Sequence, residues 1–186
     1  LDTRGAGCET NLLCVSSATS KARDGKSGTW MILPVRGDRG LGQAVQSGDD
    51  VRLANLYPFN APGADSVGVS QFCEPGGACP ALFGGYLDTN NRGCEGNLLC
   101  VSTALSKNRD SGSGTWKIES IDPSDSTVVV GSAFTMKNGY ANFTGGYLDT
   151  NNVGCEGNVY CVSTSPTRER AAASGTNAWR ASSATV

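Results

Sequence analysis

The chain has 186 residues, among them 8 cysteines, 25 glycines and no histidine, and its 15 basic and 17 acidic side chains give a formal net charge of −2. Without histidine, neither a Ser-His-Asp nor a Cys-His nucleophile pair nor a histidine-containing zinc site can form. The balanced charge, without a basic run, is not that of a nucleic-acid-binding protein, and no stretch approaches the roughly 20 apolar residues of a membrane helix.

Three related segments follow one another along the chain. Each contains Leu-Asp-Thr, then Asn-x-x-Cys-Val-Ser, then a tryptophan, in the same order. The three motifs begin at residues 1, 11 and 30 in the first segment, at 87, 97 and 116 in the second, and at 148, 158 and 179 in the third. We therefore predict internal repeats at about 1–57, 84–140 and 145–186 within one domain that spans 1–186.

The segment at about 58–83 has no counterpart in the other repeats. It carries four prolines and a cysteine pair of its own. We expect it to be an inserted surface loop, held by a disulfide, that is not part of the core.

All eight cysteines occur in one spacing, with five residues between the members of each pair. Zinc sites favour shorter spacings, so the pattern favours disulfides and hence an oxidising, extracellular compartment. Eight cysteines allow 105 pairings, but local pairing is the economical choice. The expected bridges are Cys8-Cys14, Cys73-Cys79, Cys94-Cys100 and Cys155-Cys161.

Short apolar segments separated by Gly, Asn, Asp and Ser indicate strands and turns throughout. We expect strands over 51–56, 86–88, 99–102 and 116–119, and no window has a convincing helical period. Three repeats of four strands can close a small barrel and cap it. The sequence therefore predicts an all-β chain with the architecture of a β-trefoil.

One strand of the expected twelve has no counterpart in the sequence. Segments equivalent to 48–57 and 131–140 precede the second and third Leu-Asp-Thr motifs, but none precedes the first. We expect the absent strand to belong upstream of Leu1.

The repeated strings Gly-Gly-Tyr-Leu-Asp-Thr, Val-Ser-Thr and Ser-Gly-Thr-Trp-Lys-Ile resemble the fascin-like, MIR-like and lectin-like β-trefoil modules of secreted and toxin-associated proteins. This resemblance covers nearly the whole chain outside 58–83 and implies a β-trefoil fold. That fold hosts sugar binding, protein binding, protease inhibition and actin bundling, so it implies no single activity. The Gln-x-Trp signature of ricin-type lectins is absent, because the chain has Gly-Thr-Trp at 28–30 and 114–116.

The motif Tyr-Leu-Asp-Thr-Asn-Asn occurs twice and offers a ring, a carboxylate and amides, the groups that bind sugars. The candidate ligand-binding residues are Tyr86, Asp88, Asn90, Asn91, Tyr147, Asp149, Asn151 and Asn152. The alternative is that these polar side chains only bond their own backbone in turns. Asn142, in Asn-Phe-Thr, is a candidate glycosylation site.

No constellation of nucleophile, base and oxyanion donors is present, so we expect a protein that is not an enzyme and needs no cofactor or metal. The leading hypothesis is a secreted, lectin-like carbohydrate-binding module. The alternative is a structural or scaffold protein of an extracellular matrix or biomineral filament, which binds a protein partner through its loops. A protease inhibitor is a third hypothesis, resting on the fold and on the loop between Cys73 and Cys79.

Overall fold

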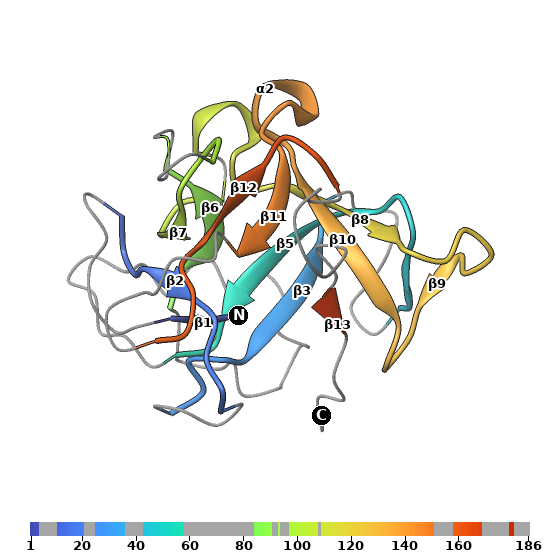
Figure 1. Ribbon diagram of the computed structural model, residues 1–186, viewed down its shortest axis with the longest axis horizontal. Coiled ribbons are helices and arrows are strands. Elements are labelled where there is room, and N and C mark those ends of the chain that lie inside the picture. Colours follow the sequence, from blue (N-terminus) through green and yellow to red (C-terminus); the bar gives the residue numbers. More distant parts are fainter. Residues whose placement is uncertain are drawn as a thin grey trace, which may run out of the picture.

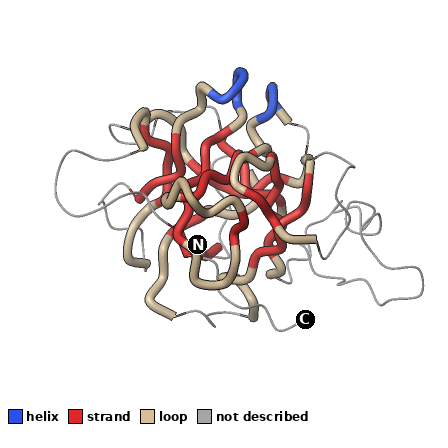
Figure 2. Tube along the Cα trace, turned by 90° about the vertical axis from the view of Figure 1, so that its right-hand side faces the viewer, coloured by secondary structure: helices blue, strands red, loops and turns tan. Residues whose placement is uncertain are grey.

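The computed structural model describes residues 1–3, 11–20, 25–35, 43–57, 84–90, 93, 97–107, 109–150, 158–168 and 179–180. Strands gather in the centre of the molecule, and two short helical turns lie at one end (Figure 2). The elements are β1 (Asp2–Thr3), β2 (Val15–Ser16), β3 (Trp30–Pro34), β4 (Val45–Gln46), β5 (Asp50–Asn55), β6 (Tyr86–Thr89), β7 (Val101–Ala104), η1 (Asp110–Gly112), β8 (Trp116–Ser120), β9 (Thr127–Val128), β10 (Ala133–Asn138), α2 (Tyr140–Phe143), β11 (Tyr147–Thr150), β12 (Val162–Ser165) and β13 (Trp179–Arg180).

The strands fall into the predicted repeats (Figure 1). The first repeat contributes β1, β2, β3 and β5, and the second contributes β6, β7, β8 and β10. The third contributes β11, β12 and β13 among the described residues. The chain is thus mostly β, and its antiparallel strands form a nearly closed barrel, as the β-trefoil prediction requires.

Nine strands form one antiparallel sheet, in the order β12-β11-β10-β8-β5-β6-β7, with β13 also paired to β10 and β3 also paired to β5. β5 and β10 each join their own repeat to the next. β10, for example, pairs with β8 of the second repeat and with β11 and β13 of the third. The repeats therefore share one hydrogen-bonded framework.

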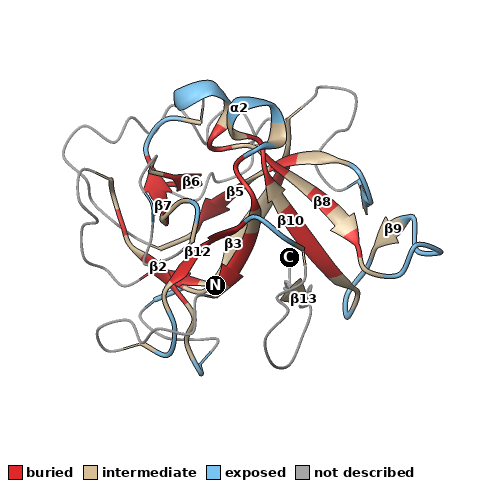
Figure 3. Ribbon diagram, turned by 45° about the horizontal axis from the view of Figure 1, so that its top comes forward, coloured by how far each residue is buried: buried red, intermediate tan, exposed pale blue. Residues whose placement is uncertain are grey.

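The main core lies inside this barrel, where each repeat supplies equivalent side chains (Figure 3). Alternation along β8 turns Trp116 and Ile118 inward, and both are 0% exposed, as are Leu87 and Leu148. The indole of Trp116 donates to the carbonyl oxygen of Leu87 at 3.0 Å. Trp116 is therefore a core residue.

Two features differ from the strand predictions. The strand expected over 99–102 begins at Val101, because the backbone N–H of Leu99 donates to the Thr164 hydroxyl of another repeat instead of continuing a hairpin. A further two-stranded sheet, β4 with β9, was not expected, since each partner is only two residues long. The predicted insertion at 58–83 lies outside the described residues.

Candidate functional site

Most described side chains of the expected sugar-binding motif are buried, and Tyr86 packs with Leu33 and Ala54 in a second cluster outside the barrel core. Tyr86 and Asp88 on β6 are 2% and 0% exposed, and Asp149 on β11 is 4% exposed. Tyr147 is half-buried, and the ammonium of Lys137 lies 5.5 Å from the centre of its ring. Tyr86, Asp88 and Asp149 are therefore largely covered by the rest of the protein, and their contact with a ligand stays a prediction.

One asparagine of the motif, Asn90, lies within the described residues and is less buried than Tyr86 and Asp88. Asn90 is half-buried, and its backbone N–H donates to the carbonyl of Cys100 at 3.1 Å, within the loop that joins β6 to β7. Asn91, Asn151 and Asn152 lie outside the described residues. The part of the motif that remains a candidate for ligand contact is therefore its asparagine end.

Asp88 is held by an arginine of its own repeat. The Arg109 Nε donates to Asp88 Oδ2 at 2.9 Å, and its Nη2 donates to the carbonyl of Thr89 at 2.6 Å. Burial raises the pKa of Asp88, while the hydrogen bond from Arg109 opposes that rise. Such a charge-assisted pair fixes the start of the loop that follows β6.

The third repeat does not reproduce this pair. Arg168, in the place of Arg109, donates to the backbone carbonyl of Ser120 at 2.9 Å. Arg109 also lies 3.4 Å from Asp110, its neighbour in the chain. The two Tyr-Leu-Asp-Thr motifs are therefore not equivalent in their electrostatics.

A cyclic set of hydrogen bonds links the three repeats around one end of the barrel. In each link, an asparagine side-chain amide donates to a serine hydroxyl in another repeat. The pairs are Asn11 with Ser102, Asn97 with Ser163, and Asn158 with Ser16. The first repeat thus binds the second, the second binds the third, and the third binds the first.

Backbone contacts follow the same cycle. The N–H of Leu13 donates to the Thr103 hydroxyl at 3.1 Å, and that of Tyr160 donates to the Ser17 hydroxyl at 3.0 Å. Isolated bridges join Cys14 to Ser102, Cys100 to Ser163, and Ser16 to Cys161. We call the surface formed by residues 11–13, 97–99 and 158–160 the threefold cap.

The second glycine of each Gly-Gly-Tyr motif, Gly85 or Gly146, leaves room for a loop of the cap to pack against it. Gly146 has φ of +86°, and a Cβ there would lie 2.8 Å from Leu98 Cδ1 and 2.6 Å from the Ser165 carbonyl oxygen. Gly85, at φ of +96°, would meet Leu12 and Thr103 in the same way. Only glycine lets the neighbouring loop pack this closely.

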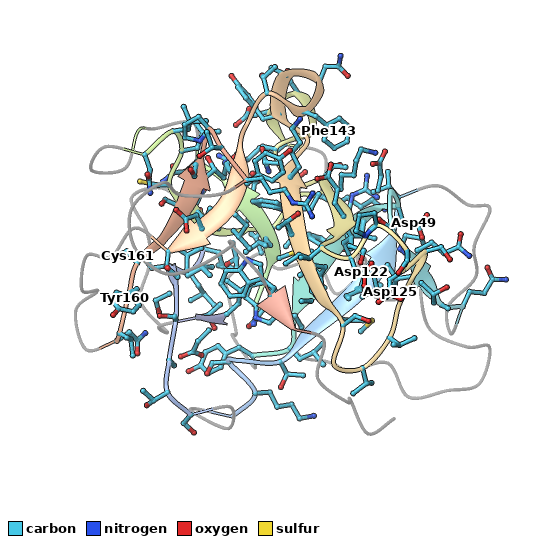
Figure 4. The ribbon with its side chains drawn as sticks, turned by 45° about the vertical axis from the view of Figure 1, so that its right-hand side comes forward. Asp49, Asp122, Asp125, Phe143, Tyr160 and Cys161 are labelled. Carbon is cyan, nitrogen blue, oxygen red and sulfur yellow. The ribbon has the colours of Figure 1, made fainter. Side chains whose placement is uncertain are left out.

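The threefold cap exposes apolar side chains. Leu98 is 39% exposed, Val159 37% and Tyr160 40%. Tyr160 takes the place of Leu13, which is 0% exposed, so the larger side chain of the third repeat projects outward. Figure 4 shows Tyr160 and Cys161 far from Asp49, Asp122 and Asp125. The sequence alone assigned Leu98, Val159 and Tyr160 no function, although all three stand at the variable positions of the repeated Asn-x-x-Cys-Val-Ser motif.

The described cysteines at the cap, Cys14, Cys100 and Cys161, are disulfide-bonded. Their expected partners Cys8, Cys94 and Cys155, and the pair Cys73 and Cys79, lie outside the described residues, so the pairing stays a prediction.

The candidate glycosylation site lies in an exposed turn. Ala141, Asn142 and Phe143 all have positive φ, between 46° and 64°, so α2 is a left-handed turn although its hydrogen bonds resemble a helix. Asn142 is exposed, and the Phe143 ring lies 4.6 Å from the Lys117 ammonium. The Asn142 side chain is accessible for modification.

A second exposed apolar site lies between β9 and β10. Val129 and Val130 are 57% and 66% exposed in the turn that joins β9 to β10, and the Ser132 N–H closes this turn by donating to the Val129 carbonyl at 2.9 Å. Within the described part of the chain, no three acidic or cysteine side chains are grouped so that they could hold a metal ion. No helix in that part is long and apolar enough to cross a membrane.

The comparisons support the fold and leave the activity open. No protein-family model and no curated protein matches this sequence. The solved structure of the SDF2-like protein from Arabidopsis thaliana, a MIR-domain β-trefoil protein, is similar, with a TM-score of 0.56 and 16% identity, covering 96% of this chain and 78% of that one. The MIR-like part of the expected resemblance is thus supported at the level of fold.

Proposed function

We propose that this protein is a secreted, non-enzymatic binding module that binds carbohydrate at the threefold cap. The observation that carries the proposal is the exposed ring of Tyr160, placed in a loop that hydrogen bonds fix to the neighbouring repeat. A flat ring held in position can stack against the C–H face of a sugar at little cost in conformational entropy.

The loops that form the cap also contain the remaining asparagine candidates. Asn90 begins the loop that leads to Leu98, and Asn151 and Asn152 precede Tyr160 in the equivalent loop. Amides supply both donors and acceptors for sugar hydroxyls. The proposal therefore combines polar groups expected from the sequence with the exposed ring of Tyr160.

The threefold repetition suits a repeated ligand. Individually weak sites gain affinity when several engage one polymer or one glycan-covered surface. The disulfide-bonded cysteines at the cap support an oxidising, extracellular location, where glycans are abundant.

A glycan array tests this function with three proteins: the wild type, Tyr160→Ala and Val130→Ala. Tyr160→Ala should lose about two- to twelvefold in affinity, because ring stacking contributes on the order of 0.5–1.5 kcal/mol. Val130→Ala removes an exposed apolar side chain from the turn between β9 and β10, which is not part of the cap. This variant should bind as the wild type does. Absence of binding to any glycan, or equal binding by all three proteins, would contradict the proposal.

A second candidate function is the binding of an extracellular protein partner, as in a matrix scaffold. The exposure of Val129 and Val130 in the turn between β9 and β10 favours it, because contiguous exposed apolar side chains mark interaction sites. Val129→Ser with Val130→Ser should then abolish partner capture and leave glycan binding intact. Removal of residues 63–80 tests the inserted loop in the same assay. A protease-inhibitor role gains no support from the described residues.

A further inference from the structure

A row of outward side chains crosses the four neighbouring strands β5, β8, β10 and β11. The register of the sheet places Asp50 opposite Lys117, Lys117 opposite Lys137, and Lys137 opposite Tyr147. The residues next to these four along each strand belong to the main core, so the four side chains lie on the outer face of the sheet. We call this set the lysine row.

The two lysines of the row occupy directly paired positions on β8 and β10. Like charges opposite each other on neighbouring strands destabilise a sheet. The equivalent row on β3, β5 and β6 consists of Met31, Ala54 and Tyr86. There Ala54 and Tyr86 are buried in an apolar cluster, against which Met31 packs. The fold therefore does not require charged side chains at the positions of Lys117 and Lys137.

Lys117 is held in place by contacts on several sides. Its ammonium donates to Asp50 Oδ1 at 2.6 Å and to the Gly48 carbonyl oxygen at 3.2 Å. The centre of the Phe143 ring lies 4.6 Å from the same ammonium. An ammonium has three N–H donors, so one remains for a further acceptor. The Lys117 side chain is 30% exposed and can be reached from solvent.

Lys137 supplies the charge that the row does not neutralise. Its ammonium lies 5.5 Å from the centre of the Tyr147 ring, and a ring attracts a cation without cancelling its charge. Glu119, two residues along β8 on the same face, is paired with Thr135. Among the described residues, no carboxylate forms an ion pair with Lys137. The row thus presents two ammonium groups against one carboxylate.

The turn that carries Phe143 is strained. Ala141, Asn142 and Phe143 have φ of 46°, 62° and 64°, in the left-handed region that residues other than glycine seldom adopt. Strain of this kind collects at ligand-binding sites. Figure 4 shows Phe143 well apart from Tyr160 and Cys161. The lysine row and Phe143 therefore form a surface separate from the threefold cap.

We infer that the lysine row is a binding site for the anionic group of an acidic saccharide, either the carboxylate of a uronic acid or a sulfate ester. The two ammonium groups supply charge-assisted hydrogen bonds to that group. The half-buried rings of Phe143 and Tyr147 beside them favour a ligand with an apolar C–H face over an acidic peptide. Because this site is separate from the cap, it does not rest on the sugar binding proposed for Tyr160.

Calorimetric titration with two acidic probes tests the inference. Oligogalacturonate carries only carboxylates and carrageenan oligosaccharides carry only sulfates, so their relative affinities distinguish the two anions. The protein is made in a host that does not glycosylate it, because Asn142 adjoins Phe143. At least one probe should bind the wild type. Lys137→Gln should weaken that binding about tenfold, since a charge-assisted hydrogen bond is lost, and Lys137→Arg should retain it.

Lys26→Gln is the matched control, because it removes the same charge from an exposed turn elsewhere and should bind as the wild type does. Lys117→Met with Lys137→Ala reproduces the residues of the equivalent row. This double variant should unfold cooperatively on heating, as the wild type does, but should bind neither probe. Neutral maltohexaose should not distinguish the wild type from Lys137→Gln.

Tyr160→Ala separates this site from the cap, because it should bind the acidic probes as the wild type does. Loss of acidic-probe binding in Tyr160→Ala, with none in Lys137→Gln, would overturn this inference and leave the proposal for the cap standing. The inference would also be overturned if neither acidic probe binds, if Lys137→Gln and Lys26→Gln bind equally, or if polyglutamate binds more tightly than both saccharides.

Discussion

The side-chain amide of Asn97 in the second repeat donates a hydrogen bond to the hydroxyl of Ser163 in the third. Equivalent bonds close the cycle through the first repeat. Replacing Asn97 by alanine should therefore lower the free energy of unfolding by about 1–2 kcal/mol, because a partly buried hydroxyl loses its partner.

Urea denaturation of Asn97→Ala, Ser163→Ala and the double variant measures this bond. The double variant should be less destabilised than the sum of the two single variants by roughly 0.5–1.5 kcal/mol. Additive effects would show that the two side chains do not interact.

Asp88 should give the stability a pH dependence. Burial raises the pKa of its carboxyl above 3.8 in the folded protein, so the folded state holds this proton more tightly than the unfolded chain does. The stabilising contribution of the protonated carboxyl is fully present below 3.8 and is lost as the pH rises through the raised folded pKa.

Asp88→Asn removes this titration. The difference in unfolding free energy between the wild type and Asp88→Asn should thus shift in favour of the variant as the pH rises from about 3 to about 7. Parallel stability curves for the two proteins across that range would contradict the raised pKa of Asp88.

Gly146→Ala should be more destabilising than Gly131→Ala. Both glycines have φ near +90°, but a Cβ at Gly131 would meet nothing within 4 Å, whereas one at Gly146 would overlap the Ser165 carbonyl and Leu98. The backbone strain is shared and costs about 1 kcal/mol, so the excess measured for Gly146→Ala reports the steric overlap alone. Equal decreases in the midpoint of thermal unfolding for the two variants would mean that Leu98 and Ser165 move away from the added Cβ at little cost.

Trp116→Ala should destabilise the protein by about 3–5 kcal/mol, since it empties a fully buried site and leaves the Leu87 carbonyl without its indole donor. Trp30→Ala should cost less, because Trp30 is partly exposed, although its indole donates to the Leu1 carbonyl in the same way. Chemical denaturation measures the loss of unfolding free energy in each variant. A larger loss for Trp30→Ala would contradict the greater burial of Trp116.

Asn142→Gln should remove one glycan when the protein is made in a glycosylating secretory host. Asn142 is exposed in a left-handed turn and makes no core contact, so folding should be unaffected. Intact-mass measurement of both proteins decides the matter, and equal masses would exclude modification at this site.

The repeats made the fold predictable, because a threefold pattern of strand and turn signals identifies equivalent strands even where each is short. The pattern alone did not show how exposed the predicted site is. Tyr86 and Asp88 have the chemistry of a sugar site, but composition does not tell that other segments of the chain cover their side chains. The hydrogen bond from Arg109 to Asp88, 21 residues earlier in the chain, could not be derived from the sequence.

The cap was harder to foresee. Asn97 and Ser163 stand in repeated motifs, but nothing in the sequence shows that an asparagine of one repeat reaches a serine of the next. The exposure of Tyr160 follows from one substitution at a position that is buried as Leu13 in the first repeat. Such differences between repeats are visible in the sequence, but their structural effect can be stated only when the burial of each position is known.

The cyclic hydrogen bonds also set the order in which the protein can fold. Asn97 and Ser163 are 66 residues apart, Asn11 and Ser102 are 91 apart, and Asn158 and Ser16 are 142 apart. Loop-closure entropy rises with separation, so the bond between Asn158 and Ser16 is the costliest to form before the rest of the barrel is in place. During synthesis, Ser16 of the first repeat can therefore accept this hydrogen bond only after Asn158 of the third repeat has been synthesised.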